Sequence, residues 1–140
     1  MDIGLLGFAA ALGLAATGSA LGAGTAGMAA VGAWKKCFAQ NRPAPFMLIA
    51  FVGAPLTQTI YGLILMNVIS GSTVPGMAKF AAGLFGGLGM GFSAWYQGKV
   101  AAAASDALAE TGKGFSNYLL ALGLVETVAL FVMVFLMISL

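Results

Sequence analysis

The segment from Phe115 to Leu140 reads FSNYLLALGLVETVALFVMVFLMISL, and Glu126 is its only charged side chain. A helix of about 20 apolar residues is long enough to cross the roughly 30 Å hydrocarbon core of a bilayer. The segment therefore predicts a membrane-spanning helix with a carboxylate near its middle. An ionised acid at that depth costs at least about 2.5 kcal/mol, and residues of this kind mark functional sites.

The composition of the whole chain also indicates a membrane protein. Of its 140 residues, 61% are hydrophobic and 7% are charged, whereas soluble domains carry about 25% charged residues. The mean hydropathy of +1.01 excludes a disordered chain. A net charge of +2 gives no basis for a nucleic-acid partner. The absence of histidine excludes Ser-His catalysis and imidazole metal sites, and the single cysteine, Cys37, excludes an internal disulfide.

Four apolar stretches are long enough to cross a bilayer, and they predict an all-α membrane protein of two helical hairpins. The first hairpin is expected over residues 1–70, with helices near 3–34 and 46–69. The second is expected over residues 71–140, with helices near 77–109 and 115–140. The third helix should leave the bilayer near residue 104 and continue through its alanine run, because alanine propagates helix well.

The two hairpins are related by an internal repeat of 74 residues, with identical residues at several paired positions. The pairs are Gly13-Leu14 with Gly87-Leu88, Ser19-Ala20 with Ser93-Ala94, Gly24 with Gly98, and Ala29-Ala30 with Ala103-Ala104. Each repeat contains two spans, so the halves have the same orientation in the membrane. Glycines at four-residue spacing in the first and third helices predict close packing of these two helices on an inner layer.

The basic residues predict how the chain is oriented in the membrane. Five lie on the side of the first and third loops and one lies on the opposite side; they are Lys35, Lys36, Arg42, Lys99 and Lys113 against Lys79. Because cytoplasmic loops carry the excess of Lys and Arg, both of these loops are expected in the cytoplasm and both termini outside.

Polar side chains of three different helices fall at one depth. Gln58, Gln97 and Glu126 lie 12, 13 and 11 residues from the cytoplasmic ends of their helices, which corresponds to about 18, 20 and 17 Å. Thr57 and Tyr61 share a helix face with Gln58.

A carboxylate, amide oxygens and a hydroxyl suit a hard cation, and a monovalent ion would leave the loaded site neutral. Pro55 adds a free backbone carbonyl one turn earlier. The alternative is that Thr57, Gln58 and Gln97 only form hydrogen bonds between helices.

Three separated motifs resemble a known family. They are Pro55–Gly62 (PLTQTIYG), Gln97–Ala103 (QGKVAAA) and Val125–Thr127 (VET). Together they resemble the membrane rotor proteolipid of V-type (V/A-type) ATPases, the K or c subunit, and in particular its sodium-transporting bacterial members. The resemblance covers all four helices in order. Leu56 stands where the sodium-type motif has glycine.

The resemblance implies a set of roles. In that family, duplicated hairpins assemble into a ring that ATP hydrolysis elsewhere in the complex rotates, and an arginine of the stator a/I subunit displaces the ion. The rotor proteolipid has no enzymatic activity by itself. Carried over to this chain, Glu126 is the ion-carrying carboxylate and Tyr61 is its hydrogen-bond partner. The further ion ligands are Thr57, Gln58, Gln97 and the backbone oxygen of Ala54.

The sequence therefore predicts a rotor-ring subunit that carries Na⁺, with H⁺ as the alternative ion and no organic cofactor. Its expected partners are identical copies, the stator subunit, a central-stalk subunit and membrane lipids. The expected location is a prokaryotic plasma membrane. Two rivals are a small independent secondary transporter that uses Glu126 and a non-transporting membrane scaffold. The mass of the detergent-resistant oligomer distinguishes a ring from both.

Overall fold

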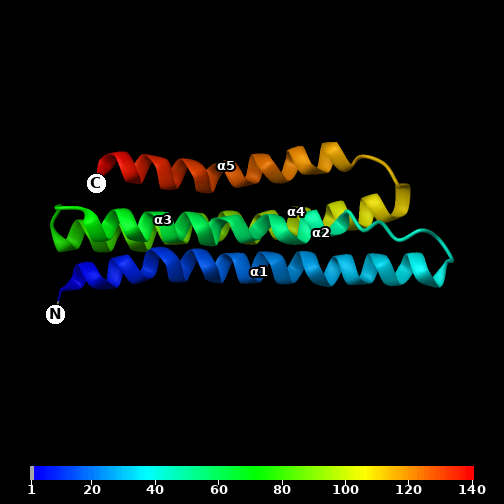
Figure 1. Cartoon of the computed structure of the whole chain (residues 1–140), viewed down its shortest axis with the longest axis horizontal. Coiled ribbons are helices and arrows are strands. Elements are labelled where there is room, and N and C mark those ends of the chain that lie inside the picture. Colours follow the sequence, from blue (N-terminus) through cyan, green and yellow to red (C-terminus); the bar gives the residue numbers. More distant parts are fainter. Residues whose placement is uncertain (1) are drawn as a thin grey trace.

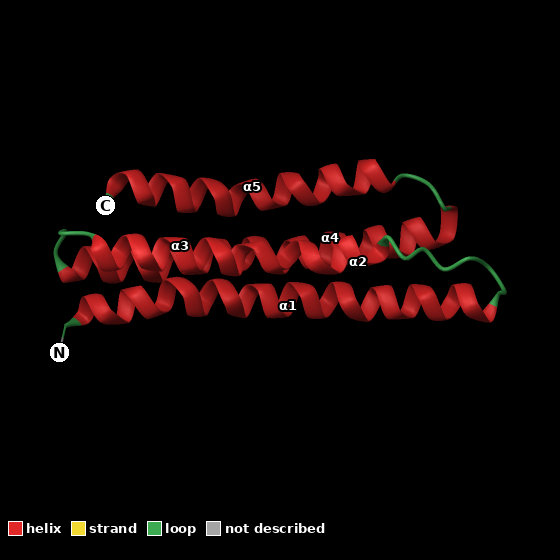
Figure 2. Cartoon of the chain, viewed as in Figure 1, coloured by secondary structure: helices red, strands yellow, loops and turns green. Residues whose placement is uncertain are grey.

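The computed structural model describes residues 2–140, and in that range the chain is helical apart from its turns (Figures 1 and 2). The all-α prediction is confirmed. Helices α2 and α3 follow one another through a short 3₁₀ turn, η1, and together form one apolar rod. The elements are α1 (Ile3–Ala39), α2 (Leu48–Gly53), η1 (Ala54–Leu56), α3 (Thr57–Gly71), α4 (Gly76–Thr111) and α5 (Phe115–Ser139).

The helices lie side by side along the long axis of the molecule, and both labelled termini are at the same end (Figure 1). Helix α4 packs between α1 and α5. Three helical segments are apolar and long enough to cross a membrane, namely Ile3–Ala39, Leu48–Gly71 and Phe115–Ser139. Helix α4 is long enough but is not among them, so its membrane span stays a prediction.

Helix α1 is longer than the sequence predicts, because it ends at Ala39 and not near residue 34. Lys35 and Lys36 therefore lie on the helix, and Cys37 is buried on it. The prediction was wrong because basic residues mark the edge of a membrane and do not by themselves end a helix. The chain turns only at Asn41, whose φ is 51°.

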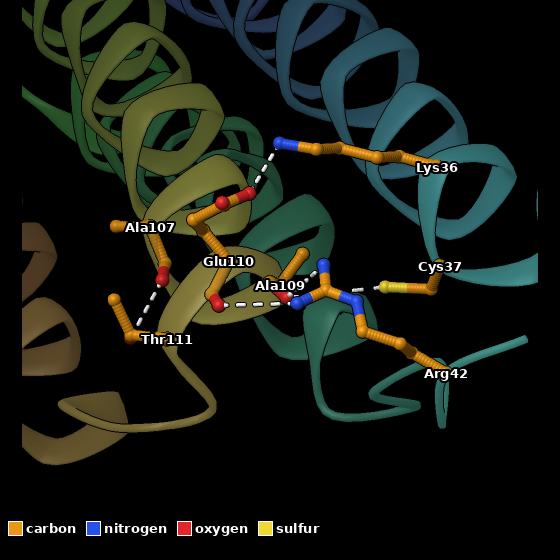
Figure 3. Close-up of polar contacts among 7 residues, drawn as sticks. All are labelled: Lys36, Cys37, Arg42, Ala107, Ala109, Glu110 and Thr111. Carbon is orange, nitrogen blue, oxygen red and sulfur yellow. Dashed lines mark hydrogen bonds and ion pairs between the residues drawn. The ribbon is translucent and has the colours of Figure 1, made fainter. Parts of the chain in front are cut away.

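Contacts with α4 hold this last turn of α1 in place (Figure 3). Lys36 forms an ion pair with Glu110, and Arg42 donates hydrogen bonds to the carbonyl oxygens of Ala109 and Glu110. The hydrogen bond from Lys36 and its positive charge lower the pKa of Glu110. Directly after α4, at this same end, Gly112 adopts φ 65°, the left-handed conformation that terminates helices.

Helices α1 and α4 are in backbone contact along glycine positions. A Cβ atom at Gly18 would overlap the backbone of Gly91, and one at Gly98 would overlap the backbone of Gly22. These partners are 73 and 76 residues apart, close to the 74-residue repeat. The two helices that the repeat relates therefore run parallel and face each other at matching heights.

Gly98→Ala tests this packing. The added methyl group would meet the backbone of Gly22, and such overpacking costs about 1–3 kcal/mol. We expect the free energy of unfolding in mixed detergent, followed by circular dichroism, to fall by that amount. Gly24→Ala is the matched control, because a Cβ at Gly24 has no atom within 4 Å. Equal unfolding curves for the two variants would contradict the packing.

Candidate ion-binding site

A layer of polar side chains lies between two clusters of buried apolar residues. The cluster near the first and third loops contains Phe51 and Leu122, and the cluster near the termini contains Leu65 and Met133. The polar layer occupies the positions between them on each helix, and the buried residues Gln58 and Gln97 belong to it.

The carboxylate of Glu126 is half-buried on α5 and receives hydrogen bonds from two other helices. Tyr61 of α3 donates its hydroxyl to Oε1 at 2.6 Å, and Gln97 of α4 donates Nε2 to Oε2 at 3.1 Å. Each oxygen of the carboxylate therefore has one hydrogen-bond donor. Hydrogen bonds to an ionised acceptor are about twice as strong as neutral ones.

The two glutamines connect Glu126 to α3 through a row of amides. Gln58 donates Nε2 to Oε1 of Gln97 at 2.9 Å, and Gln97 also donates to the carbonyl oxygen of Leu122 at 3.1 Å. Both glutamine side chains are fully buried. Buried polar groups require partners of this kind, so the row fixes the orientation of each amide.

The break in the helix at Pro55 gathers further oxygen atoms beside the amides. Proline has no backbone N–H, which removes one helical hydrogen bond, and residues Ala54–Leu56 form the 3₁₀ turn η1. The hydroxyl of Thr57 lies 3.0 Å from the carbonyl oxygen of Ala54 and 3.0 Å from Oε1 of Gln58. Three neutral oxygen atoms thus lie close together next to the amide row.

The structure brings the predicted site residues into one continuous hydrogen-bonded group of Ala54, Thr57, Gln58, Tyr61, Gln97 and Glu126. Pro55 is buried in the 3₁₀ turn η1, next to Ala54 of this hydrogen-bonded group. Within residues 2–140, no cluster of three or more Cys, Asp or Glu side chains is placed to hold a metal ion. One carboxylate among neutral oxygens is a donor set for a hard monovalent cation or a proton. The role of these residues as ligands stays a prediction.

Comparison with known proteins shows which proteins the chain is similar to. The family model for the C subunit of ATP synthase matches residues 80–139, the part that holds Gln97 and Glu126. This part of the chain is similar to that family. It is also 36% identical, over 132 residues, to the K subunit of the A-type ATP synthase of Methanocaldococcus jannaschii. That alignment covers 92% of this chain and 57% of the relative, so the chain spans little more than half of the relative's length. The resemblance to V/A-type proteolipids is confirmed.

One residue of the site, Ser93, was not predicted from the sequence. Ser93 of α4 donates its hydroxyl to the carbonyl oxygen of Val125 at 2.8 Å, directly before Glu126. This bond ties the helix that carries the acid to the helix that carries Gln97. Two signals were available, since Ser93 lies four residues before Gln97 and matches Ser19 in the repeat.

Tyr61→Phe tests whether the tyrosine holds the carboxylate. The change leaves Oε1 of Glu126 without its donor and frees the carboxyl group to rotate toward the lipid. We expect labelling of Glu126 by a hydrophobic carbodiimide, at fixed pH and without Na⁺, to become several times faster. Tyr118→Phe is the matched control, because Tyr118 packs edge-on against Phe51. An unchanged rate in Tyr61→Phe would show that the contact does not restrain the acid.

Proposed function

We propose that this chain is the ion-carrying rotor-ring subunit of a V/A-type ATPase, with Glu126 as the ion seat and Na⁺ as the ion; H⁺ is the alternative. The observation that carries the proposal is the hydrogen-bonded group around Glu126. A carboxylate that meets donors from α3 and α4 is oriented, yet its half-buried position on α5 leaves it within reach of a partner.

The oxygen ligands favour Na⁺, because several neutral oxygen atoms surround a single carboxylate. The carbonyl oxygen of Ala54, the hydroxyl of Thr57 and Oε1 of Gln58 already lie together. The Gln97 amide links this group to the carboxylate, because it accepts from Gln58 and donates to Glu126. A monovalent cation among these groups would leave no net charge to place in lipid, which favours rotation of the loaded subunit through the bilayer.

The exposed surface of α5 suits a position at the lipid boundary of a ring. Leu120 and Leu124 are 70% and 71% exposed, and Phe131 and Phe135 are also exposed. Large apolar side chains in contact with lipid need no further partner. We propose four spans, including α4, in two hairpins. Identical copies form the ring, with a stator a/I subunit, a central-stalk subunit and membrane lipids as partners.

The positions of the charged residues indicate how the ring is oriented in the membrane. Lys36, Arg42 and Glu110 gather at the end of the molecule that holds the first and third loops (Figure 3), which we place in the cytoplasm of a prokaryotic cell, with both termini outside. Lys99 is the basic residue nearest the polar layer. Its ammonium group lies 4.5 Å from the ring centroids of Trp95 and Tyr96, a cation–π contact that compensates for lost hydration.

The independent secondary transporter is the weaker interpretation of the same site. It accounts for Glu126 but gives no reason for the in-register glycine contacts of α1 with α4, which a compact ring subunit needs. The similarity to the C subunit of ATP synthase and to the K subunit of an A-type ATP synthase also favours the rotor. Such a subunit moves ions while catalysis takes place elsewhere in the complex.

Protection of Glu126 by sodium tests the choice of ion. A cation at the site would block carbodiimide labelling, so we expect labelling to fall as Na⁺ is raised at constant ionic strength. Thr57→Val removes one proposed ligand and should raise the half-protecting Na⁺ concentration about tenfold, the equivalent of about 1.4 kcal/mol. Thr59→Val, on the same helix but outside the hydrogen-bonded group, should leave it unchanged. Labelling that is insensitive to Na⁺ would rule out sodium and leave the proton.

A further inference from the structure

Ser19 of α1 lies at the height of the polar layer but takes no part in the hydrogen-bonded group. It is 2% exposed, and its hydroxyl has no hydrogen-bond partner among residues 2–140. An unsatisfied buried hydroxyl lowers stability relative to an apolar residue of similar size. Alanine occupies the equivalent buried position one turn earlier, at Ala15. The hydroxyl of Ser19 therefore requires an explanation that packing does not supply.

Two contacts fix how α1 lies against the rod of α2, η1 and α3. A Cβ atom at Gly62 would lie 2.7 Å from the Cβ of Ala15, and a Cβ atom at Gly22 would lie 2.8 Å from the Cβ of Pro55. Residue numbers rise along one helix while they fall along the other, so the two run antiparallel. Seven residues separate the two contact positions on each of them.

Ser19 and Gln58 both lie between these two contacts. Each is four residues from the first contact position on its own helix and three residues from the second. Residues three and four apart share a helix face. Helical periodicity therefore places the two side chains opposite each other in the buried interface.

The side-chain amide of Gln58 has one N–H that forms no hydrogen bond among the described residues. A side-chain amide carries two N–H donors. One is used in the bond from Nε2 to Gln97, while Oε1 accepts from Thr57. The second N–H has no hydrogen-bond acceptor among the described residues, and the Ser19 hydroxyl on the opposite helix has no partner either.

The internal repeat gives an independent reason to relate this serine to the site. Ser93 occupies the position 74 residues after Ser19, and its hydroxyl donates to Val125 beside Glu126. In the second half, then, the serine of α4 bonds to α5 at the polar layer. The first half has the same serine at the same height.

We propose that Ser19 is a positioning residue for the ion site. After a rotation about χ1, its hydroxyl oxygen accepts the second N–H of Gln58 and holds Oε1 toward Thr57 and the cation. Without this bond the amide can turn its N–H groups toward the ion, which they repel. The inference rests on the cation site proposed above and adds a residue on α1 to it.

Ser19→Ala tests the proposal, in an assembled oligomer of the same mass as that of the unaltered protein. We expect the Na⁺ concentration that half-protects Glu126 from carbodiimide to rise about 5–10-fold, the effect of one lost hydrogen bond. Ser19→Cys, with a weaker acceptor of similar size, should give an intermediate rise. Ser105→Ala is the matched control, because Ser105 is fully buried and equally unpartnered but lies toward the loop end of α4. Ser105→Ala should change the half-protecting Na⁺ concentration by less than twofold.

A second measurement separates this inference from the sodium proposal. Without Na⁺, a loosened Gln58 should loosen Gln97 and Glu126 in turn, so Ser19→Ala should be labelled faster than Ser105→Ala. If the unaltered protein shows no sodium protection, the sodium proposal fails, and the sodium-free rates still decide the role of Ser19. The proposed role of Ser19 would be overturned if the two variants had equal sodium-free labelling rates. It would also be overturned if both changed the half-protecting Na⁺ concentration equally.

Discussion

The carboxylate of Glu126 imposes the constraint on which the centre of the bundle depends. A charge in an apolar surrounding costs several kcal/mol unless donors and counter-ions meet it. Here Tyr61 and Gln97 supply a donor to each oxygen, and Gln97 is in turn held by Gln58 and by a backbone carbonyl. The polar layer exists because this one group must be satisfied, and the apolar clusters on either side isolate it from the ends of the molecule.

The glycine contacts of α1 with α4 make that arrangement possible. Lipid provides no hydrophobic force between helices, so close backbone approach supplies the attraction by van der Waals contact. Gly22 and Gly98 bring α1 against α4 at the level just beyond Gln97. A helix with larger side chains there would displace α4 and with it the donor to Glu126. The repeat in the sequence thus becomes a parallel helix pair that fixes the depth of the site.

Much of this followed from the sequence, because membrane helices are long apolar runs and a charge within one is conspicuous. Counting residues from the loop ends placed Gln58, Gln97 and Glu126 at one depth, and the structure joins them by hydrogen bonds. Pairing across the fold could not be predicted in this way. The last turn of α1 depends on the ion pair of Lys36 with Glu110, and the bond from Ser93 to Val125 depends on how α4 and α5 are rotated. Neither rotation nor pairing is encoded in local composition.

The most direct test of the central claim is ATP-driven ion uptake by membrane vesicles that contain the whole complex assembled with Glu126→Gln. The amide keeps the size of the side chain and can still accept from Tyr61, so the ring should form, but it cannot carry the charge that an ion neutralises. Uptake should be abolished, while Glu110→Gln, a carboxylate paired with Lys36 outside the polar layer, should keep it. Uptake that persists in Glu126→Gln would contradict the account.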